Sequence, residues 1–181
     1  ALVDALSLMG DVRALLRQTR GVLYDLVLGP QRRRRDAGQI RSGRFEKEYL
    51  AVVHGETDAR GTLRDWMIRD RARKMSFVTD GPGKDVQEAV LDYEVLASAE
   101  DLSLVKIYLQ TGRTHQIRCQ FSSRGLPLWG DKKYSTLPDD GPIALWSHAL
   151  HFAHPDSGEV LFFEQQPPAI KPWTDFTTNQ E

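Results

Sequence analysis

Cysteine is almost missing from this chain, and its scarcity excludes two kinds of stabilising site. Cys119 is the single cysteine among 181 residues, so no disulfide can form within the chain. No combination of Cys and His residues has the spacing of a zinc site. We therefore expect a metal-free protein from a reducing compartment, with Cys119 as a buried structural thiol and not a reactive one.

Long apolar runs are missing as well. No stretch of roughly eighteen apolar residues occurs, and residues 1–10 carry no basic segment ahead of their apolar residues. The sequence therefore predicts neither a membrane span nor a signal peptide, and we expect a cytoplasmic protein. With 40% hydrophobic and 27% charged residues, the chain can bury one substantial core, so a single domain is the first expectation.

The net charge is close to zero, which excludes a uniformly basic nucleic-acid binder. Because the formal charge is -1, any phosphate contacts must come from local clusters. Residues 1–49 hold ten Lys and Arg against six Asp and Glu, an excess of four positive charges. A second basic cluster lies around Trp66 and consists of Arg64, Arg69, Arg71, Arg73 and Lys74. The alternative for both clusters is an ordinary solvated face.

The hydrophobic pattern predicts several short strands and few helices. Strands are expected at residues 22–28, 49–53, 89–97, 102–109, 143–152 and 159–163. Helices are expected over residues 1–20 and over residues 115–123, the second with Thr114 as its N-cap. Residues 54–83 are punctuated by glycines and predict an irregular charged insertion between strands. Short connections favour antiparallel pairing, so we expect an α+β domain with a mixed, mostly antiparallel sheet.

Four sequence elements in a fixed order indicate a family. Residues 109–118 read LQTGRTHQIR at the expected strand-to-helix junction, and residues 127–134 read PLWGDKKY. Residues 47–55 read KEYLAVVHG, and residues 149–155 and 167–173 complete the series. Over residues 40–176 these elements resemble the C-terminal part of the catalytic domain of the RluA-type RNA pseudouridine synthases.

The resemblance implies an activity, a partner and a set of site residues. It implies an isomerase that converts uridine to pseudouridine in structured ribosomal or transfer RNA, without cofactor or metal. Such an enzyme takes its target base out of the stack into a pocket. Carried over by position, Tyr49 lies against the target base and Arg118 pairs with the catalytic aspartate. The residues expected to bind RNA are Arg113, His115, Gln116, Arg44, Lys47, Arg64 and Arg69, and we expect a monomer with no membrane partner.

The expected helix has a physical interpretation of its own. Ile117 and Phe121 lie one turn apart and predict a buried stripe, whereas Thr114, Arg118 and Ser122 fall on another face that could line a pocket. An arginine near a helix start is unfavourable to the helix dipole, so a nearby carboxylate or phosphate would explain Arg118. Without the motif, Arg118 would be a surface ion pair and Tyr49 a core strand residue.

Other polar and aromatic residues carry weaker indications. His115 either contacts RNA or caps the end of the strand through a backbone hydrogen bond, and the two alternatives stay open. Asp131 is expected to fix the turn after Gly130 as a hydrogen-bond acceptor. Trp129 and Trp146 are expected in the core, and Trp66 is open between packing and RNA contact.

One element of the family is not recognisable. The H-R-L-D element, whose aspartate the reaction requires, should lie near Arg17, where no residue is acidic. Asp11, Asp25 and Asp36 lack the family's spacing to Tyr49. Residues 1–38 are therefore either a divergent N-terminal segment or a reading-frame artefact joined to a partial catalytic domain at 39–181, and we favour the second. We expect the chain as written to form no pseudouridine and to leave Arg118 without its carboxylate partner.

The missing element leaves rival functions open. A catalytically inactive RNA-binding homologue would keep Tyr49, Arg118 and the basic clusters. A β-rich protein-interaction module would explain the strands but not the ten-residue element at 109–118. Salt-dependent RNA binding separates this module from the other two possibilities.

Overall fold

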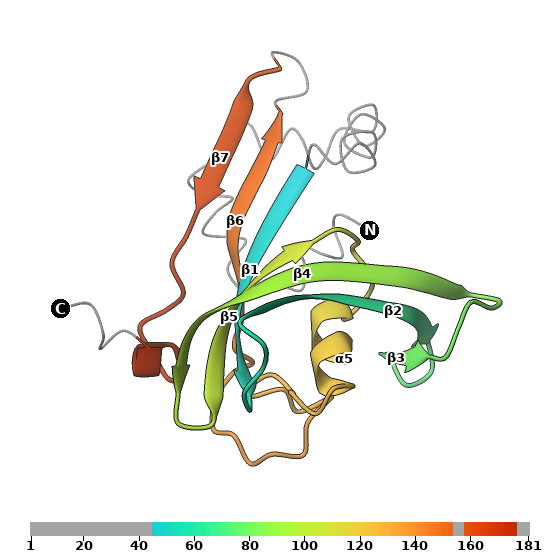
Figure 1. The fold of residues 1–181 in the computed structure, drawn as a ribbon, viewed down its shortest axis with the longest axis horizontal. Helices are drawn as coiled ribbons and strands as arrows, with labels where there is room; N and C mark the ends of the chain where they lie inside the picture. The colour runs from blue at the N-terminus through green and yellow to red at the C-terminus, as the bar shows by residue number, and fades with distance from the viewer. Residues whose placement is uncertain (1–44, 154–157, 177–181) are drawn as a thin grey trace. The chain divides into compact units, whose positions relative to one another are not determined.

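A computed structural model describes residues 45–153 and 158–176 of the chain (Figure 1). The expected helix over 1–20, the expected strand at 22–28, the segment 1–38 and Arg44 lie outside these described residues. No helix in the described ranges is both long enough and apolar enough to cross a membrane. The description that follows therefore concerns the part of the chain that carries the four sequence elements.

The described residues form seven strands, one α-helix and one short 3-10 helix. The strands are β1 (Phe45–His54), β2 (Arg60–Asp70), β3 (Met75–Thr79), β4 (Val86–Ala99), β5 (Leu102–Leu109), β6 (Leu145–Ala153) and β7 (Val160–Glu164). The helices are α5 (Gln116–Ser122) and η1 (Trp173–Phe176). Every pairing among β1 to β5, and that of β6 with β7, is antiparallel. An α+β fold with a mostly antiparallel sheet is thereby confirmed.

The chain divides into two compact units, and the larger one holds the candidate site. This unit consists of Glu48–Trp146 and Pro167–Glu181, and its strands follow the order β3-β2-β4-β5-β1. In the other unit, β6 and β7 form an antiparallel pair in which Leu150 faces Phe163. The strands predicted at 143–152 and 159–163 correspond to β6 and β7 with ends shifted by one or two residues.

The register of the central strands defines a face of the sheet that the helix covers. Tyr49 is opposite Ile107, which is in turn opposite Tyr93, and directly opposed residues of antiparallel strands point to the same side. The Tyr93 ring makes an edge contact with Phe121 of α5, with ring centroids 5.5 Å apart. We call this side of the sheet the helix face; Figure 1 shows α5 lying alongside β2 and β4.

The other side of the sheet has its own apolar cluster. Leu50 and Val52 alternate with the helix-face residues of β1 and pack with Leu102, Ala144 and Trp173. Four partly buried residues extend this cluster: Leu104, Trp129, Trp146 and Phe176. The expectation that Trp129 and Trp146 belong to the core is confirmed, although both remain partly exposed.

The prediction of an irregular insertion at 54–83 was wrong, because these residues form β2 and β3. In β2, Leu63, Asp65 and Met67 point to the helix face, and the aspartate interrupts the apolar alternation that marks a half-buried strand. The Asp65 carboxylate is satisfied there by the amide of Gln120 and by an ion pair with Arg124. A partly buried acid that finds its partners on α5 and in the residues after it cannot be recognised from the strand alone.

The helix begins one residue later than predicted, and Thr114 is not its N-cap. His115 occupies the cap position in the left-handed conformation, with φ 54° and ψ 27°, and its side chain makes no capping bond. Few residues other than glycine adopt this conformation, and asparagine, aspartate and histidine do so more often than the rest. The predicted buried stripe is confirmed, since Ile117 and Phe121 are both buried.

Gly130 provides a test of how tightly the loop after α5 is packed. Its φ is +69°, and a Cβ atom there would lie 2.5 Å from the Pro142 carbonyl oxygen. Gly125 has a similar φ of +76° but nothing within 4 Å of a Cβ, so alanine at both positions has the same backbone cost. We expect Gly130→Ala to lower the free energy of unfolding by about 1 to 3 kcal/mol more than Gly125→Ala, because overpacking adds to that cost. Urea denaturation measures this difference. Equal decreases in the free energy of unfolding for the two variants would show that the loop can move to accommodate the added methyl group.

Candidate functional site

The ten-residue element at 109–118 forms the end of β5, a tight turn and the start of α5. Gln116 locks this turn: its side-chain oxygen accepts hydrogen bonds from the Thr111 hydroxyl at 2.8 Å and the Arg113 amide at 2.9 Å. Its side-chain nitrogen donates to the Val90 carbonyl oxygen. Gln116 is 3% exposed. The structure thus gives Gln116 a role within the turn, and the predicted contact with RNA would require these bonds to break.

Arg113 is also tied to the sheet. Its Nε donates to the Glu88 carbonyl oxygen of β4 at 2.7 Å, and the residue is half-buried. A guanidinium has five N–H donors, so this single bond leaves the remaining donors of Arg113 for other partners. Its predicted contact with RNA stays a prediction.

Arg118 has a carboxylate partner, Asp131, that was not identified from the sequence; its predicted lack of the catalytic aspartate stays a prediction. Its Nε donates to Asp131 Oδ2 at 2.7 Å and its Nη2 to Asp131 Oδ1 at 2.5 Å, a two-pronged ion pair. The side chains are 18% and 0% exposed, respectively. The sequence argument considered only acids upstream of Tyr49 and therefore overlooked an aspartate thirteen residues after the arginine. The dipole argument, which required a local carboxylate or phosphate, is confirmed.

Asp131 also fixes the turn after Gly130, as predicted. Its Oδ1 accepts the backbone amides of Lys133 at 3.0 Å and Tyr134 at 3.1 Å. Burial by itself would raise the pKa of Asp131, but the hydrogen bonds and charge of Arg118 outweigh burial and hold the pKa below its usual value. The aspartate is therefore ionised at neutral pH and joins the turn to α5.

Tyr134 lies at the centre of the contacts around this ion pair. The Arg118 guanidinium is 5.1 Å from the centre of the Tyr134 ring. The Tyr134 hydroxyl accepts the Ser76 amide of β3 at 2.7 Å and lies 2.9 Å from His115 Nδ1. The Ser122 hydroxyl donates to the Tyr134 carbonyl oxygen. The face of α5 that was expected to line a pocket is thus in contact with the turn at residues 131–134.

His115 is surrounded by more positive than negative charge. Burial contributes most to lowering its pKa to about 4, followed by the charges of Arg118 and Lys133. Arg69 of β2 lowers the pKa slightly further, and only Asp131 raises it. The ring is therefore uncharged at neutral pH. Neither alternative from the sequence included its hydrogen bond with a tyrosine hydroxyl.

Tyr49, the other catalytic candidate, is a buried residue of β1. It is 9% exposed, and burial raises the pKa of its hydroxyl to about 12. The register places its side chain on the helix face, the side on which α5 carries Arg118. The two candidates are therefore not on opposite sides of the sheet, and their closeness around one cleft stays a prediction.

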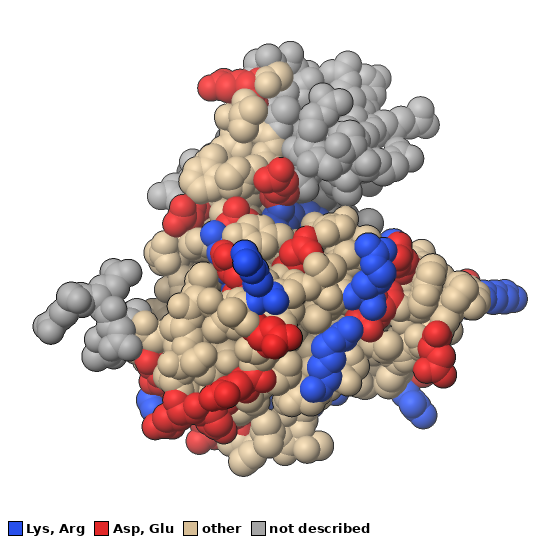
Figure 2. Space-filling view, in the orientation of Figure 1, with Lys and Arg blue, Asp and Glu red and all other residues tan. Residues whose placement is uncertain are grey.

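The basic cluster around Trp66 is divided between the two sides of the sheet. Arg69 is exposed and follows Asp65 and Met67 on the helix face. Arg64 lies on the other side, where it forms an ion pair with Glu88. Basic and acidic side chains are interspersed over the described residues of the side shown in Figure 2. The cluster is thus not one continuous patch.

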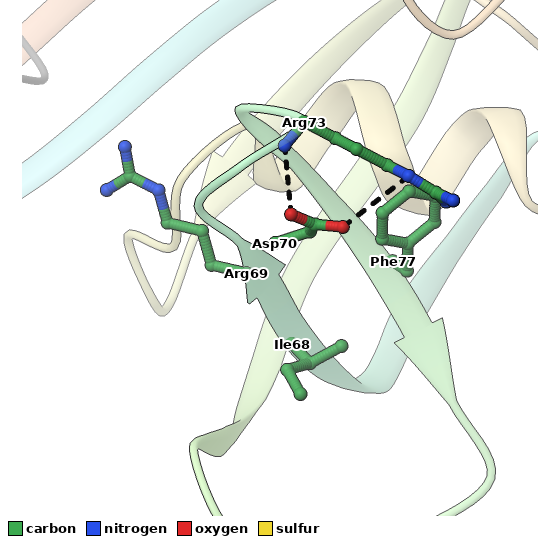
Figure 3. A pocket seen from close by; sticks show the side chains of 5 residues that line it. All are labelled: Ile68, Arg69, Asp70, Arg73 and Phe77. Atoms are coloured by element: carbon green, nitrogen blue, oxygen red, sulfur yellow. Dashed lines mark hydrogen bonds and ion pairs between the residues drawn. The ribbon is translucent and has the colours of Figure 1, made fainter.

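The structure also has a hollow beside the β2–β3 turn. Its volume is about 400 Å³, and it is lined by Ile68, Arg69, Asp70, Arg73 and Phe77 (Figure 3). Asp70 accepts the Arg73 amide at 2.9 Å and lies 3.6 Å from Arg73 Nε. In Figure 3 the Arg69 side chain points away from Phe77 and from this ion pair. Among the residues that line the hollow, Arg69 is the one whose charge acts on the pKa of His115.

Cys119 and Lys47 complete the set of candidates. Cys119 is buried, its thiol donates to the Ser76 carbonyl oxygen, and burial raises its pKa to about 11, so the expected structural thiol is confirmed. Lys47 is half-buried, and burial lowers its pKa. In residues 45–153 and 158–176, no group of three or more His, Cys, Asp and Glu side chains is placed to hold a metal ion.

Some residues that organise the site were not singled out from the sequence. His54 Nε2 lies 2.9 Å from Asp139 Oδ2, which also accepts the Gly130 amide, and the His54 ring stacks on Trp129. These contacts close the loop between Gly130 and Asp139. Tyr134 belonged to a recognised element, PLWGDKKY, but its hydroxyl partners come from distant parts of the chain, and no local spacing indicates them.

Comparisons with known proteins place this geometry in a family. The family described as RNA pseudouridylate synthase matches residues 33–123. The chain is 39% identical to the Uncharacterized RNA pseudouridine synthase YlyB of Bacillus subtilis, over 65% of this chain and 39% of that protein. It is 33% identical to the Ribosomal large subunit pseudouridine synthase D of Zymomonas mobilis, over 73% of this chain and 44% of that protein.

A solved structure agrees at the level of the fold. Human RNA Pseudouridylate Synthase Domain Containing 1 superposes with a TM-score of 0.65 at 23% identity, over 79% of this chain and 63% of that one. The chain spans about two fifths of the length of these two curated relatives. On these matches, together with the RluA-type elements at 47–55, 109–118 and 127–134, the chain belongs to the RNA pseudouridylate synthase family.

Proposed function

We propose that this chain carries the C-terminal part of a catalytic domain that isomerises uridine to pseudouridine in structured ribosomal or transfer RNA. One observation carries the proposal: Arg118 of the 109–118 element lies on α5 and is held there in a fixed position by Asp131 and the Tyr134 ring. Ribosomal RNA is favoured by the name of a relative, a ribosomal large subunit pseudouridine synthase.

The reaction assigns a distinct task to each candidate residue. The bond from ribose C1' to uracil N1 breaks, the base turns, and C1' joins C5. A flipped base needs an aromatic surface, which the family resemblance assigns to Tyr49. The step at C1' needs a carboxylate in contact with the sugar, as nucleophile or as base. The resemblance assigns the positioning of that carboxylate to Arg118.

Asp131 is unsuited to be this carboxylate. Its side chain is 0% exposed and already accepts four hydrogen bonds, two from Arg118 and two from backbone amides. It therefore acts as a support that orients the guanidinium. Arg118 uses Nε and Nη2 for Asp131, and its Nη1 has no hydrogen-bond partner in the described part of the chain. Nη1 is the group available to a second carboxylate or to a phosphate.

The first test is for the product itself. We expect the chain as given to form no pseudouridine, because Asp131 cannot reach a ribose and no upstream acid has the family spacing to Tyr49. Replacing residues 1–38 by a family segment that contains H-R-L-D restores activity. Arg17→Asp alone does not, because a carboxylate also needs supporting structure. Chromatography of nucleosides from treated RNA measures the product.

One outcome of this test would contradict the expected inactivity of the chain as given, and another would contradict the proposed function. If the chain as given makes pseudouridine, alanine at Asp11, Asp25 and Asp36 in turn would identify the acid that acts. If the chain with the H-R-L-D segment folds and binds RNA but makes no product, the inactive RNA-binding homologue is the correct function.

A second test uses the two arginines that the sheet separates. Arg69→Gln should reduce the slope of log K against log salt concentration by about 0.7 to 0.9, the contribution of one phosphate contact. Arg64→Gln is the matched control, because Arg64 is engaged with Glu88 on the other side of the sheet. Filter binding of a ribosomal RNA fragment at several salt concentrations gives both slopes. Equal effects of the two substitutions would show that the helix face is not the RNA-binding side.

A further inference from the structure

The hydrogen bonds of Tyr134 determine which nitrogen of His115 carries the proton. The Ser76 amide can only donate, so the Tyr134 oxygen accepts it at 2.7 Å. The one proton of the hydroxyl then has His115 Nδ1 as its acceptor, 2.9 Å away. The opposite arrangement would leave the hydroxyl proton without an acceptor in the described part of the chain, at a cost. Nδ1 is therefore unprotonated, and the neutral ring carries its proton on Nε2.

The charges that face His115 come from each element packed around it. Arg118 belongs to α5, Asp131 and Lys133 to the following turn, and Arg69 to β2. Three cations against one carboxylate oppose a fourth positive charge on the protonated ring, and burial opposes it further. Electrostatics and hydrogen bonding thus favour the same uncharged state.

The position of the ring makes its second nitrogen available. His115 is half-buried, and Nε2 has no hydrogen-bond partner in the described ranges. The residue occupies the junction between turn and helix in a left-handed conformation that is uncommon for residues other than glycine. Such local strain is retained where the surrounding structure holds a group in place. Here the ring is held on one side by Tyr134, with which it makes an edge-on contact at 5.6 Å.

We propose that Tyr134 is a positioning residue that holds His115 as an uncharged donor, whose Nε2–H binds an oxygen of the RNA beside Arg118. The proposal rests on the proposed function, because it names RNA as the partner. It separates two kinds of recognition at one site. Arg69 and Arg118 attract phosphate through charge, whereas His115 contributes a directional bond that neither salt nor mild acid weakens.

The test is Tyr134→Phe in the full chain, with Tyr108→Phe as the matched control. Tyr108 donates its hydroxyl proton to Glu94 at 2.9 Å on the side of the sheet opposite the helix face, so the control removes a comparable bond. Long-range nitrogen–proton NMR spectra of the free protein report the tautomer of His115. We expect the Nε2–H form in the unmodified chain and in Tyr108→Phe, and a mixture of both tautomers in Tyr134→Phe.

RNA binding provides the second measurement. Tyr134→Phe should weaken RNA binding about three- to tenfold, the range for one hydrogen bond, with an unchanged salt slope because no charge is lost. His115→Asn, which suits the left-handed backbone, should weaken binding by a similar factor. The double variant should lose no more than His115→Asn alone. If Tyr134→Phe unfolds too readily at room temperature, the same binding measurements on all variants at low temperature should give the same relative losses.

Specific results would overturn the proposal. An Nδ1–H tautomer in the unmodified chain, or an unchanged tautomer in Tyr134→Phe, shows that Tyr134 does not determine which nitrogen of His115 carries the proton. Additive losses in the double variant show that Tyr134 acts independently of His115. A failure of the proposed function is recognised separately, by missing product in the activity test or by missing RNA binding of the unmodified chain, while the NMR spectra of the free protein still decide the role of Tyr134.

Discussion

The ion pair between Arg118 and Asp131 is the interaction on which the rest of the site depends. It joins α5 to a turn that has no other regular structure, and it forms across a separation of only thirteen residues. Loss of either partner would leave a charge that is largely shielded from water, which costs about 3 to 5 kcal/mol. The pair therefore fixes the guanidinium in one orientation and at the same time brings Tyr134 under it.

The hydrogen bonds of Tyr134 extend this arrangement to β3 and to the start of the helix. The Tyr134 hydroxyl accepts a hydrogen bond from the Ser76 backbone amide and donates one to the His115 ring. A strand, a turn and the residue before a helix are thus linked through one oxygen atom. The Cys119 thiol adds a second link from α5 to Ser76. Buried polar networks of this kind specify one geometry when every member is satisfied. The charged and uncharged donors of the site are held by the same contacts.

The sequence predicted the features that depend on local order. The strands at β4 and β5, the buried stripe of α5 and the turn-forming role of Asp131 follow from alternation, helical spacing and turn chemistry. The sequence did not predict β2 and β3, because Asp65 occupies a partly buried position on the helix face, where its contacts with Gln120 and Arg124 satisfy it. Asp131 was missed as the partner of Arg118 because the family pattern places the catalytic aspartate before Tyr49, and only acids in that part of the chain were considered. Hydrogen bonds between residues far apart in the sequence, such as Ser76 and Tyr134, cannot be predicted from the spacing of residues along the chain.

The continuous register of β2 has a consequence for how the chain tolerates length changes. Arg64 and Arg69 are five positions apart, an odd number, and so project from opposite surfaces of the same strand. Deleting or inserting one residue between them would exchange the side from which one of the two cations projects, without altering composition or net charge. Related chains that keep both arginines but differ in length by one residue here would therefore present a different electrostatic surface to a polyanion.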